Sequence, residues 1–512
     1  MIETGTNRQL ATQSAALNVG SLFAFQARYG GARIALDDGV RQYTYAQANE
    51  RVNRLAHALA TIGIQRGDRV GILAENRTEF IELELAAAKL AAIVAALNWR
   101  FVPAELDHCT QLVEPKVILV SARFKAQLDG ISYRKARVIV IEDEYEKLLA
   151  GASAAEPPDV AEPEDGLTIL YTSGTTGMPK GAMISHRAAI ARGQVFGIDQ
   201  HFAADDGFVA WAPLFHMAST DMTLATLMNG GKVTVVDGYK PERLAEIVTR
   251  ERINWFVIMP GMVQTFSAAM RAQKGKVAGI KAMGAMADLI PREQLAEVTR
   301  LTGTPFLNSF GSTETGMPPA SKGVVGIGET PARMPKVQSS GCRIRLVDEH
   351  DHDVPDGDPG ELAIRGPTLF SGYWNAPETN AKDFRGGWFH MGDMFVRNPD
   401  GTLDFVDRRK YLIKSGGENI YPAEIERVLL ADPRIGDAVV VRKPDDRWGE
   451  VPVAFVVRKD AGLTEADVVA CCNGKIARYK LPKEVRFVAD SELPRSATGK
   501  IKRYELEAVL KK

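Results

Sequence analysis

The chain has 512 residues, of which 45% are hydrophobic and 25% are charged, and its formal net charge is -1. These values are ordinary for a globular protein, and the length predicts two or three domains. The near-neutral charge argues against a nucleic-acid-binding protein that works through a basic surface, and against strong attraction to anionic lipid.

The cysteines and the N-terminus predict a cytoplasmic protein. The four cysteines lack the spacing of a metal site and are typical of free thiols in a reducing cytosol. The first twenty residues show no basic start followed by an apolar stretch, so no signal peptide is predicted. The longest near-apolar segment, residues 85–97, is interrupted by Lys89 and is too short to cross a bilayer.

The first half of the chain alternates between helix and strand patterns. Residues 44–64 predict a helix, because Thr44 and Gln47 have capping-box spacing and an apolar face follows. Residues 78–97 predict a second helix, and Pro241 occupies the first position of a third. Short apolar runs typical of buried parallel strands are found at residues 69–76, 116–120, 137–141, 232–237 and 254–260. The alternation predicts an α/β fold with doubly wound sheets.

The pattern changes near Gly360. Residues 360–366 and 401–417 combine short alternating segments with glycine turns, which indicates a small antiparallel, β-barrel-like part. The last hundred or so residues predict a helix that opens at Pro422, two strands at 437–443 and 451–459, and a helix at 464–476. We therefore expect a large N-terminal domain over residues 1–407 and a small α+β C-terminal domain over residues 408–512.

One loop carries the chemistry of a phosphate site. The segment TSGTTGMPK, Thr172 to Lys180, directly follows the apolar run 167–170. Glycines let backbone N–H groups approach a ligand, hydroxyls donate to anionic oxygens and Lys180 adds a positive charge, which together suit a polyphosphate. A flexible Ser/Gly loop without function is the plain alternative. A P-loop is disfavoured, because that motif needs Ser or Thr directly after the lysine and Gly181 stands there.

The loop resembles the signature phosphate loop of the adenylate-forming enzymes. These include acyl-CoA synthetases, 4-coumarate:CoA ligases, firefly luciferase and the adenylation domains of peptide synthetases. Four further motifs follow in the family's order, so that the resemblance covers nearly the whole chain: NSFGSTETG at 308–316, GWFHMGDM at 387–394, DRRKYLIKSGGENIYPAEIE at 407–426 and LPRSATGKIKR at 493–503. The chain is identified as a member of the acyl-CoA synthetase branch. The resemblance implies that a carboxylic acid and ATP give an acyl-adenylate and pyrophosphate, after which coenzyme A attacks and AMP leaves.

The resemblance also implies the residues of the ATP site. Glu314 and Thr176 hold Mg²⁺, Thr313 contacts the α-phosphate, and Lys500 grips the carboxylate and α-phosphate oxygens during adenylation. Without the other motifs, Glu314 would read as a solvated carboxylate and Lys500 as a solubilising charge. The residues implied for ATP and AMP binding are Thr172, Ser173, Gly174, Thr175, Thr176, Gly177, Lys180, Ser309, Phe310, Gly311, Asp393 and Arg408.

In relatives the small domain rotates between the two half-reactions. Lys410 occupies the hinge position, and rotation brings the face with residues 415–419 toward the thiol channel while it removes Lys500. The alternative interpretation of the charged residues around Lys410 is a solvated turn without a hinge function. The chain departs from the family at Phe310, where Tyr is usual, at Met391, where Thr is usual, and at Tyr411, where an acidic residue is common.

The acid is left open: a medium-chain, branched, alicyclic or aryl acid fits. The resemblance places the acyl pocket and the coenzyme A tunnel at His216, Met217, Met286, Met317, Gly416 and Gly417. Read alone, His216 is more typical of a core histidine. Asp221 either faces a polar group of the substrate or lies on a helix surface, and we favour the helix surface.

Two rival functions stay open. The enzyme could load the pantetheine of a carrier protein, although the chain shows no appended carrier domain, or it could be a catalytically silent ATP-binding scaffold. Intact Lys500, Glu314 and Asp393 argue against the scaffold. Neither a nucleic-acid partner nor a transmembrane segment is expected. Homodimers are common among similar proteins, but the sequence does not fix the oligomeric state.

Overall fold

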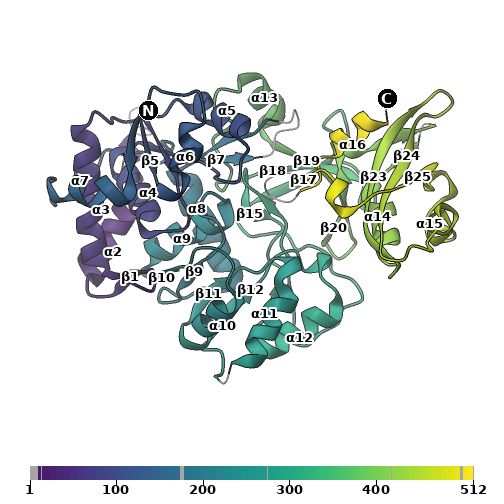
Figure 1. Cartoon of the computed structure of the whole chain (residues 1–512), viewed down its shortest axis with the longest axis horizontal. Coiled ribbons are helices and arrows are strands. Elements are labelled where there is room, and N and C mark those ends of the chain that lie inside the picture. Colours follow the sequence, from purple (N-terminus) through teal and green to yellow (C-terminus); the bar gives the residue numbers. More distant parts are fainter. Residues whose placement is uncertain are drawn as a thin grey trace, which may run out of the picture. The chain divides into compact units, whose positions relative to one another are not determined.

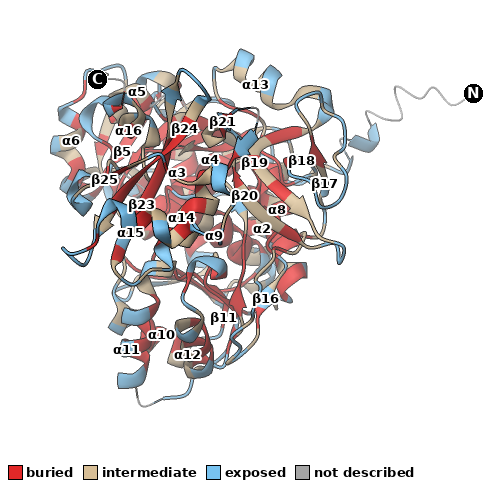
Figure 2. Ribbon diagram, turned by 90° about the vertical axis from the view of Figure 1, so that its right-hand side faces the viewer, coloured by how far each residue is buried: buried red, intermediate tan, exposed pale blue. Residues whose placement is uncertain are grey.

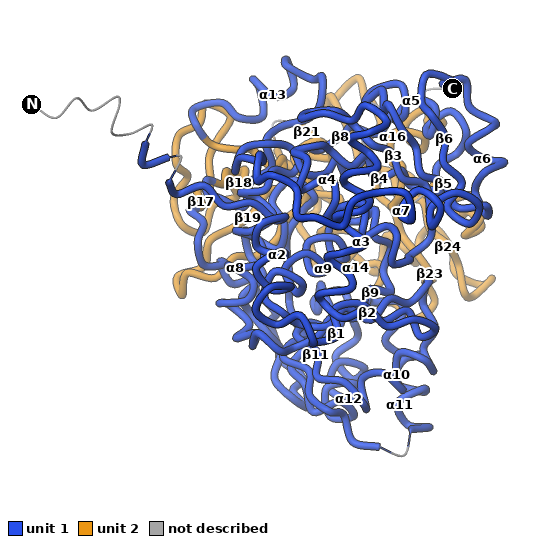
Figure 3. Tube along the Cα trace, turned by 90° about the vertical axis from the view of Figure 1, so that its left-hand side faces the viewer, with its two compact units in different colours: residues 1–343, 365–387 blue, residues 344–364, 388–512 orange. Residues whose placement is uncertain are grey.

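The computed structural model describes residues 10–12, 14–172, 178–273, 275–416, 418–495 and 500–510. The chain divides into two compact units, the first formed by residues 1–343 with 365–387 and the second by residues 344–364 with 388–512 (Figure 3). Each unit is described by itself. The predicted domain boundary at residues 407 and 408 concerns a rotation between two reaction steps, and it stays a prediction.

The first unit contains a six-stranded sheet with the order β6-β5-β3-β4-β7-β8, of which β5 and β7 are labelled in Figure 1. All its strands are parallel except β8, which runs antiparallel to β7. The strands are β3 (Arg69–Leu73), β4 (Ile93–Ala96), β5 (Val117–Val120), β6 (Arg137–Val140), β7 (Gly166–Thr172) and β8 (Lys180–Ser185). The helices in this part are α2 (Val19–Gly30), α3 (Tyr45–Thr61), α4 (Thr78–Leu90), α5 (Pro103–Val113), α6 (Lys125–Asp129) and α7 (Glu146–Ala150).

Two four-stranded sheets complete the strand layers of the first unit, with the orders β2-β1-β10-β9 and β11-β12-β13-β16. Their strands are β1 (Ile34–Asp37), β2 (Gln42–Thr44), β9 (Phe208–Ala210), β10 (Val233–Val235), β11 (Ile253–Phe256), β12 (Ile280–Met283), β13 (Phe306–Leu307) and β16 (Val324–Val325). A two-stranded hairpin joins β14 (Gly311–Ser312) to β15 (Gly316–Pro319). The helices are α8 (His186–Gln200), α9 (Met217–Asn229), α10 (Pro241–Arg250), α11 (Val263–Ala272), α12 (Arg292–Thr302) and α13 (Pro377–Asp383). The doubly wound α/β prediction is confirmed.

Local sequence signals fix several helix ends. The Thr44 side chain accepts from the backbone N–H of Gln47, and Gln47 returns a bond to the Thr44 N–H, so α3 begins with the predicted capping box. The prediction of a single helix over residues 78–97 is wrong. Helix α4 ends at Leu90, Ala91 adopts a left-handed conformation with φ 53°, and β4 follows. An apolar run without periodicity cannot distinguish a buried helix from a buried strand.

The second unit contains two sheets that share no strand, and the second of them is mixed, because β25 runs parallel to β24. The first has the order β17-β18-β19-β20, and the second has the order β22-β21-β24-β23 with β25 paired to β24. The strands are β17 (Arg343–Val347), β18 (Gly360–Arg365), β19 (Phe389–Arg397), β20 (Leu403–Arg408), β21 (Ile413–Ser415), β22 (Glu418–Ile420), β23 (Ile435–Asp445), β24 (Gly449–Arg458) and β25 (Glu484–Phe487). The helices are α14 (Pro422–Leu430), α15 (Glu465–Cys472) and α16 (Arg503–Val509).

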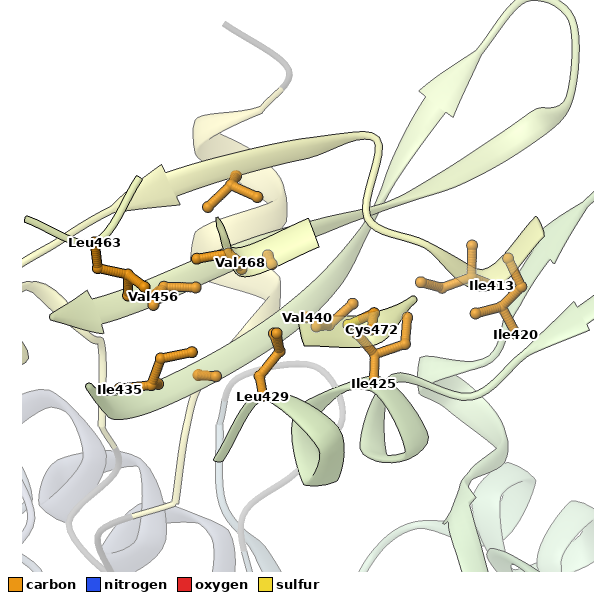
Figure 4. Packing of buried hydrophobic residues seen from close by; sticks show 13 residues of the cluster. Ile413, Ile420, Ile425, Leu429, Ile435, Val440, Val456, Leu463, Val468 and Cys472 are labelled. Carbon is orange, nitrogen blue, oxygen red and sulfur yellow. The ribbon is translucent and has the colours of Figure 1, made fainter. Parts of the chain in front are cut away.

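The C-terminal sheet has a hydrophobic core on each face. Val440 belongs to the cluster that includes residues of α14 and α15, shown in Figure 4. Val439 and Val441 belong to the other cluster, which includes Leu506 of α16. Neighbouring residues of a strand point to opposite faces, so β23 supplies both cores. The predicted α+β character of this part is confirmed.

Burial follows the layers within each unit. Figure 2 shows the strands mostly buried, whereas α10, α11 and α12 expose their outer faces. All four cysteines are free, as predicted. None of the helices within the described ranges combines the length and the apolar composition needed to cross a lipid bilayer.

Candidate active site

The two arms of the predicted phosphate loop leave neighbouring strands and are anchored by α5. Thr172 and Lys180 are paired across β7 and β8. The Tyr171 hydroxyl donates to the Cys109 carbonyl (3.1 Å), and His108 Nε2 donates to the Pro179 carbonyl (3.1 Å). One helix therefore fixes the entry and the exit of the loop. The predicted loop residues Ser173, Gly174, Thr175, Thr176 and Gly177 lie outside the described residues.

Lys180 and Glu314 meet the same aromatic side chain. The Lys180 ammonium lies 4.3 Å from the centroid of the Tyr373 ring, and the Tyr373 hydroxyl donates to Glu314 Oε1 (2.8 Å). Glu314 stands at the tip of the β14–β15 hairpin, and its carbonyl accepts from the Phe370 N–H (2.8 Å). Lys180 and Glu314 were predicted from their motifs, whereas Tyr373 stands outside the five motifs and was not predicted.

The Glu314 carboxylate fits the magnesium ion that the resemblance implies. Mg²⁺ prefers one or two carboxylates together with phosphate oxygens and water. Among the described residues, Glu314 Oε2 accepts no hydrogen bond, so one oxygen is available beside the one that Tyr373 engages. The described part of the chain holds no group of three or more His, Cys, Asp or Glu residues that could bind a metal ion by themselves. A metal here would therefore depend on phosphate oxygens as well as on Glu314.

A buried lysine joins residues 284–289 to the start of the predicted motif at residues 308–316. Lys336 Nζ donates to Asp288 Oδ1 (2.6 Å), to Asn308 Oδ1 (2.6 Å) and to the Ser309 carbonyl (3.1 Å). Lys336 is 3% exposed, and burial lowers its pKa while Asp288 opposes the shift. The Met286 N–H donates to the Ser309 hydroxyl (3.2 Å), a further link between the same segments.

Two backbone features shape this part of the site. Gly284 has φ 74°, and a Cβ there would lie 1.9 Å from the Phe306 ring, so only glycine fits. Met286 adopts φ 54°, which is unusual for a side chain of its size. Phe310 is half-buried, and its N–H donates to the Ser321 hydroxyl (3.0 Å).

A buried ion pair lies behind the Thr313 turn. Arg192 is 2% exposed and donates to both carboxylate oxygens of Asp221 (3.2 and 3.3 Å) and to the carbonyls of Thr313 and Thr368 (both 2.9 Å). Asp221 is itself 5% exposed, so the preferred placement on a helix surface is wrong. Burial raises the pKa of Asp221, and Arg192 opposes that shift. Helix α9 is buried on nearly every side, and its sequence therefore lacks the periodicity of a half-exposed helix.

His216 begins α9 and is exposed. Its Nδ1 accepts from the Ala218 N–H (3.4 Å). The core-histidine alternative is therefore wrong. Met217, in the first turn of α9, and Met317, on β15, are both buried, and these two elements pack against each other.

In the second unit, two of the residues that the resemblance implies for ATP and AMP binding are paired. Asp393 on β19 stands opposite Arg408 on β20, and Arg408 Nε lies 2.9 Å from Asp393 Oδ1. Asp393 is 2% exposed. Met391, at the position where relatives usually have Thr, is half-buried on the same strand.

The predicted hinge residue lies in a short 3₁₀ turn, Arg409–Tyr411. Burial lowers the pKa of Lys410 to about 8, Arg408 and Arg503 add to the shift, and Asp393 opposes it. The ring of Tyr411 lies under the Arg503 guanidinium (4.8 Å), and Arg503 Nη2 donates to Glu426 Oε2 (2.9 Å). Tyr411, where the family often has an acidic residue, therefore anchors this turn to α14 and α16.

The remaining predicted residues also belong to the second unit. Lys500 is exposed and precedes Ile501, which bridges to Arg495. Gly416 has φ 61°, and a Cβ there would lie 2.8 Å from the Trp448 ring. Gly417 lies outside the described residues.

Comparison with known proteins identifies the family. Residues 23–374 match the family described as AMP-binding enzyme, and residues 424–500 match the AMP-binding enzyme C-terminal domain. The chain is similar to an indoleacetate–CoA ligase from Aromatoleum aromaticum, with 35% identity over 92% of this chain and 94% of the relative. It is also similar to a feruloyl-CoA synthase from an Amycolatopsis species, with 33% identity over 95% of this chain and 98% of the relative.

Among solved structures, ATP-bound MatB from Rhodopseudomonas palustris matches with a TM-score of 0.82 and 28% identity, over 97% of this chain and 99% of that chain. The fold, the family match and the similarity to CoA ligases thus agree along most of the sequence. The protein belongs to the AMP-binding enzyme family, in its AMP-forming acyl-CoA synthetase branch.

Proposed function

We propose that this protein converts an aromatic monocarboxylic acid, of the arylacetate or hydroxycinnamate class, into its coenzyme A thioester at the expense of ATP. The observation that carries the proposal is the similarity, over more than nine-tenths of the chain, to two ligases whose named acids are both aromatic monocarboxylates. The flexible side chains of Met217, Met286 and Met317, predicted for the pocket, adapt to flat apolar shapes.

The buried charges next to α9 favour an acid with a single carboxylate. A second carboxylate on the substrate would need a cation to replace the water that it loses. Arg192 is the buried cation on α8, and Asp221 together with two carbonyls already engages it. It is therefore not offered to a second anionic group, and an acid with one carboxylate suits this region better than a dicarboxylate.

In the first half-reaction, the substrate carboxylate attacks the α-phosphorus of ATP and pyrophosphate leaves. Negative charge on the α-phosphate oxygens is stabilised by preorganised donors, so the catalysis is positional and electrostatic. We assign this role to Lys500, Thr313 and the loop that ends at Lys180. Mg²⁺, held at Glu314 and Thr176, would supply charge neutralisation of the phosphates. The nucleotide would be held by Thr172, Ser173, Gly174, Thr175, Thr176, Gly177, Ser309, Phe310, Gly311, Asp393 and Arg408.

In the second half-reaction, the coenzyme A thiolate attacks the acyl carbonyl, the bond to the phosphate oxygen breaks and AMP departs. We assign the hinge for the preceding domain rotation to Lys410. His216, which is exposed at the start of α9, would border the acyl pocket and the thiol path, together with Gly416 and Gly417. No protein nucleophile is needed, because the acyl-adenylate is already an activated mixed anhydride.

A panel of acids tests the proposal. Purified protein is incubated with ATP, Mg²⁺, coenzyme A and one acid at a time: indoleacetate, phenylacetate, ferulate, 4-coumarate, benzoate, octanoate or malonate. AMP and acyl-CoA are both quantified. We expect one aromatic monocarboxylate to give the highest kcat/KM, and stoichiometric AMP and thioester.

The other outcomes separate the rivals. A preference for octanoate or malonate would overturn the aromatic assignment. AMP formation that needs a pantetheinylated carrier protein in place of coenzyme A would identify a carrier-loading enzyme. Failure of every acid to support pyrophosphate exchange would favour the silent scaffold.

A further inference from the structure

Tyr373 lies between two oppositely charged residues of the proposed ATP site. Its ring faces the Lys180 ammonium at 4.3 Å, and its hydroxyl donates to Glu314 Oε1 at 2.8 Å. The side chain is buried, with 8% exposure. One neutral residue thus contacts the cation at the end of the phosphate loop and the carboxylate that suits the metal.

The backbone fixes where this ring stands. Residues 371–374 run antiparallel to β8: the Ser371 N–H donates to the Met183 carbonyl (2.8 Å), and the Trp374 N–H donates to the Gly181 carbonyl (2.8 Å). The Tyr373 N–H donates to Asn380 Oδ1 (2.8 Å), and Asn380 Nδ2 returns a bond to the Tyr373 carbonyl (2.9 Å). The segment therefore acts as an added edge strand beside Lys180, and Tyr373 has little freedom to move.

Phe370 supports the ring from one side. The two rings make an edge-to-face contact with centroids 4.9 Å apart. The Phe370 N–H also donates to the Glu314 carbonyl (2.8 Å), so the same short segment holds the backbone of the metal-site residue. Side chain and backbone thus place Glu314 from one direction.

The arrangement keeps two opposite charges from neutralising each other. Among the described residues, Lys180 forms no ion pair and Glu314 has no basic partner. A direct Lys180–Glu314 pair would have to break before the ammonium could meet phosphate and the carboxylate could meet a metal. An aromatic face attracts a cation without cancelling its charge, and a phenol can orient a carboxylate while it leaves the second oxygen available.

We propose that Tyr373 is a positioning residue that separates Lys180 from Glu314, so that the ammonium is directed to the triphosphate of ATP and the carboxylate to the divalent metal. The inference rests on the proposed function. It adds that the hydroxyl governs the affinity for the metal, whereas the ring governs the placement of the lysine.

Two variants separate the two roles. Tyr373→Phe keeps the ring and removes the hydroxyl, and Tyr373→Leu removes both. Tyr133→Phe is the control, because it also deletes one phenol hydrogen bond, in this case to the Pro115 carbonyl (3.0 Å), but lies outside the site. Mn²⁺ binding is followed by electron paramagnetic resonance on protein saturated with a non-hydrolysable ATP analogue. Binding of the analogue without metal is measured separately by calorimetry.

We expect Tyr373→Phe to weaken Mn²⁺ binding by about tenfold, because it removes a hydrogen bond to a charged group. Affinity for the metal-free nucleotide should stay at the wild-type value. Tyr373→Leu should lose metal affinity and also several-fold in metal-free nucleotide affinity, because Lys180 can then pair with Glu314. Tyr133→Phe should change neither value.

Wild-type Mn²⁺ affinity in Tyr373→Phe would overturn the proposal. So would equal loss of Mn²⁺ and metal-free nucleotide binding in that variant, which indicates general damage to the site. If Tyr373→Leu fails to fold, the Phe variant still decides the role of the hydroxyl. Failure of the wild-type protein to bind the ATP analogue or to form acyl-CoA would instead refute the proposed function.

Discussion

Replacement of Lys336 by methionine tests whether one buried cation holds residues 284–289 and 308–311 together. Methionine keeps most of the apolar volume of the side chain but donates no hydrogen bonds. The change removes three bonds, to Asp288, Asn308 and the Ser309 carbonyl. Breaking a buried ion pair by removing one partner costs about 3–5 kcal/mol. The Asp288 side chain is 31% exposed and can be rehydrated in part, which favours the lower end, about 3 kcal/mol.

Amide hydrogen exchange measures this loss of stability in the affected segments. A loss of about 3 kcal/mol raises exchange from the opened state by roughly a hundredfold, because each 1.4 kcal/mol is a factor of ten. We expect that increase in peptides covering residues 284–289 and 308–311, together with at least a tenfold rise in the KM for ATP. The control is Lys322→Met, because the side chain of Lys322 is 49% exposed in the same unit. Unchanged exchange in both segments of Lys336→Met would refute the reasoning, as would equal effects of the two variants.

Three further variants probe the remaining charges. Lys500→Ala should slow adenylation by about 10²–10³-fold but spare thioester formation from pre-made acyl-adenylate. Equal loss in the two half-reactions, measured by pyrophosphate release and by AMP release, would contradict the domain alternation. Asp221→Ala leaves Arg192 buried without its carboxylate partner, so we expect the unfolding free energy to fall by about 3–5 kcal/mol. An Arg192→Met/Asp221→Leu double variant should recover most of this loss. If it recovered none, the broken ion pair would not be the cause of the loss. Lys410 has a pKa of about 8 in the fold and 10.5 as a free side chain. Between pH 8 and pH 10.5 the side chain therefore takes up a proton when the protein unfolds, and the unfolding free energy of the wild type increases as the pH rises through this range. The melting temperature of Lys410→Met should therefore exceed that of the wild type by most below pH 8. If this difference did not shrink toward pH 10.5, the lowered pKa of Lys410 would not be its cause.

Local signals predicted the starts of helices better than their ends. The capping box at Thr44 and the proline at position 241 placed the starts of α3 and α10, because caps act within a single helical turn. The prediction of one helix over residues 78–97 was wrong, because the helix ends at Ala91 in a left-handed conformation that an alanine in the sequence does not predict. The surrounding apolar run suits a buried helix and a buried strand equally well.

The candidate site was predictable where a motif places chemistry in a short stretch of chain. Asp393 and Arg408 were named from separate motifs, and the structure brings them into contact across two strands. Tyr373, Lys336 and Arg192 were missed, because each acts through partners far along the sequence and none has a distinctive neighbourhood. The role of such residues can be recognised only once the fold shows which groups they contact.

In this conformation, hydrogen bonds join the parts of the chain that precede and follow the proposed hinge residue. Asp407, at the end of β20, accepts at Oδ2 from the Ala423 N–H in the first turn of α14 (2.7 Å), and at Oδ1 from the Arg408 N–H (2.6 Å). Asp407 is 3% exposed, so the bond to α14 is shielded from water. Asp393 and Arg408 precede Lys410 in the chain and α14 follows it, so the Asp407–Ala423 bond spans the proposed hinge and breaks in any rotation that carries α14 away from β20. Arg408 lies next to the proposed hinge residue along the chain, and displacement in a rotation grows with distance from its axis. The proposed contact of Arg408 with the nucleotide would thus persist while α14 and the rest of the C-terminal sheet change position, as a two-step reaction that keeps AMP bound between its steps requires.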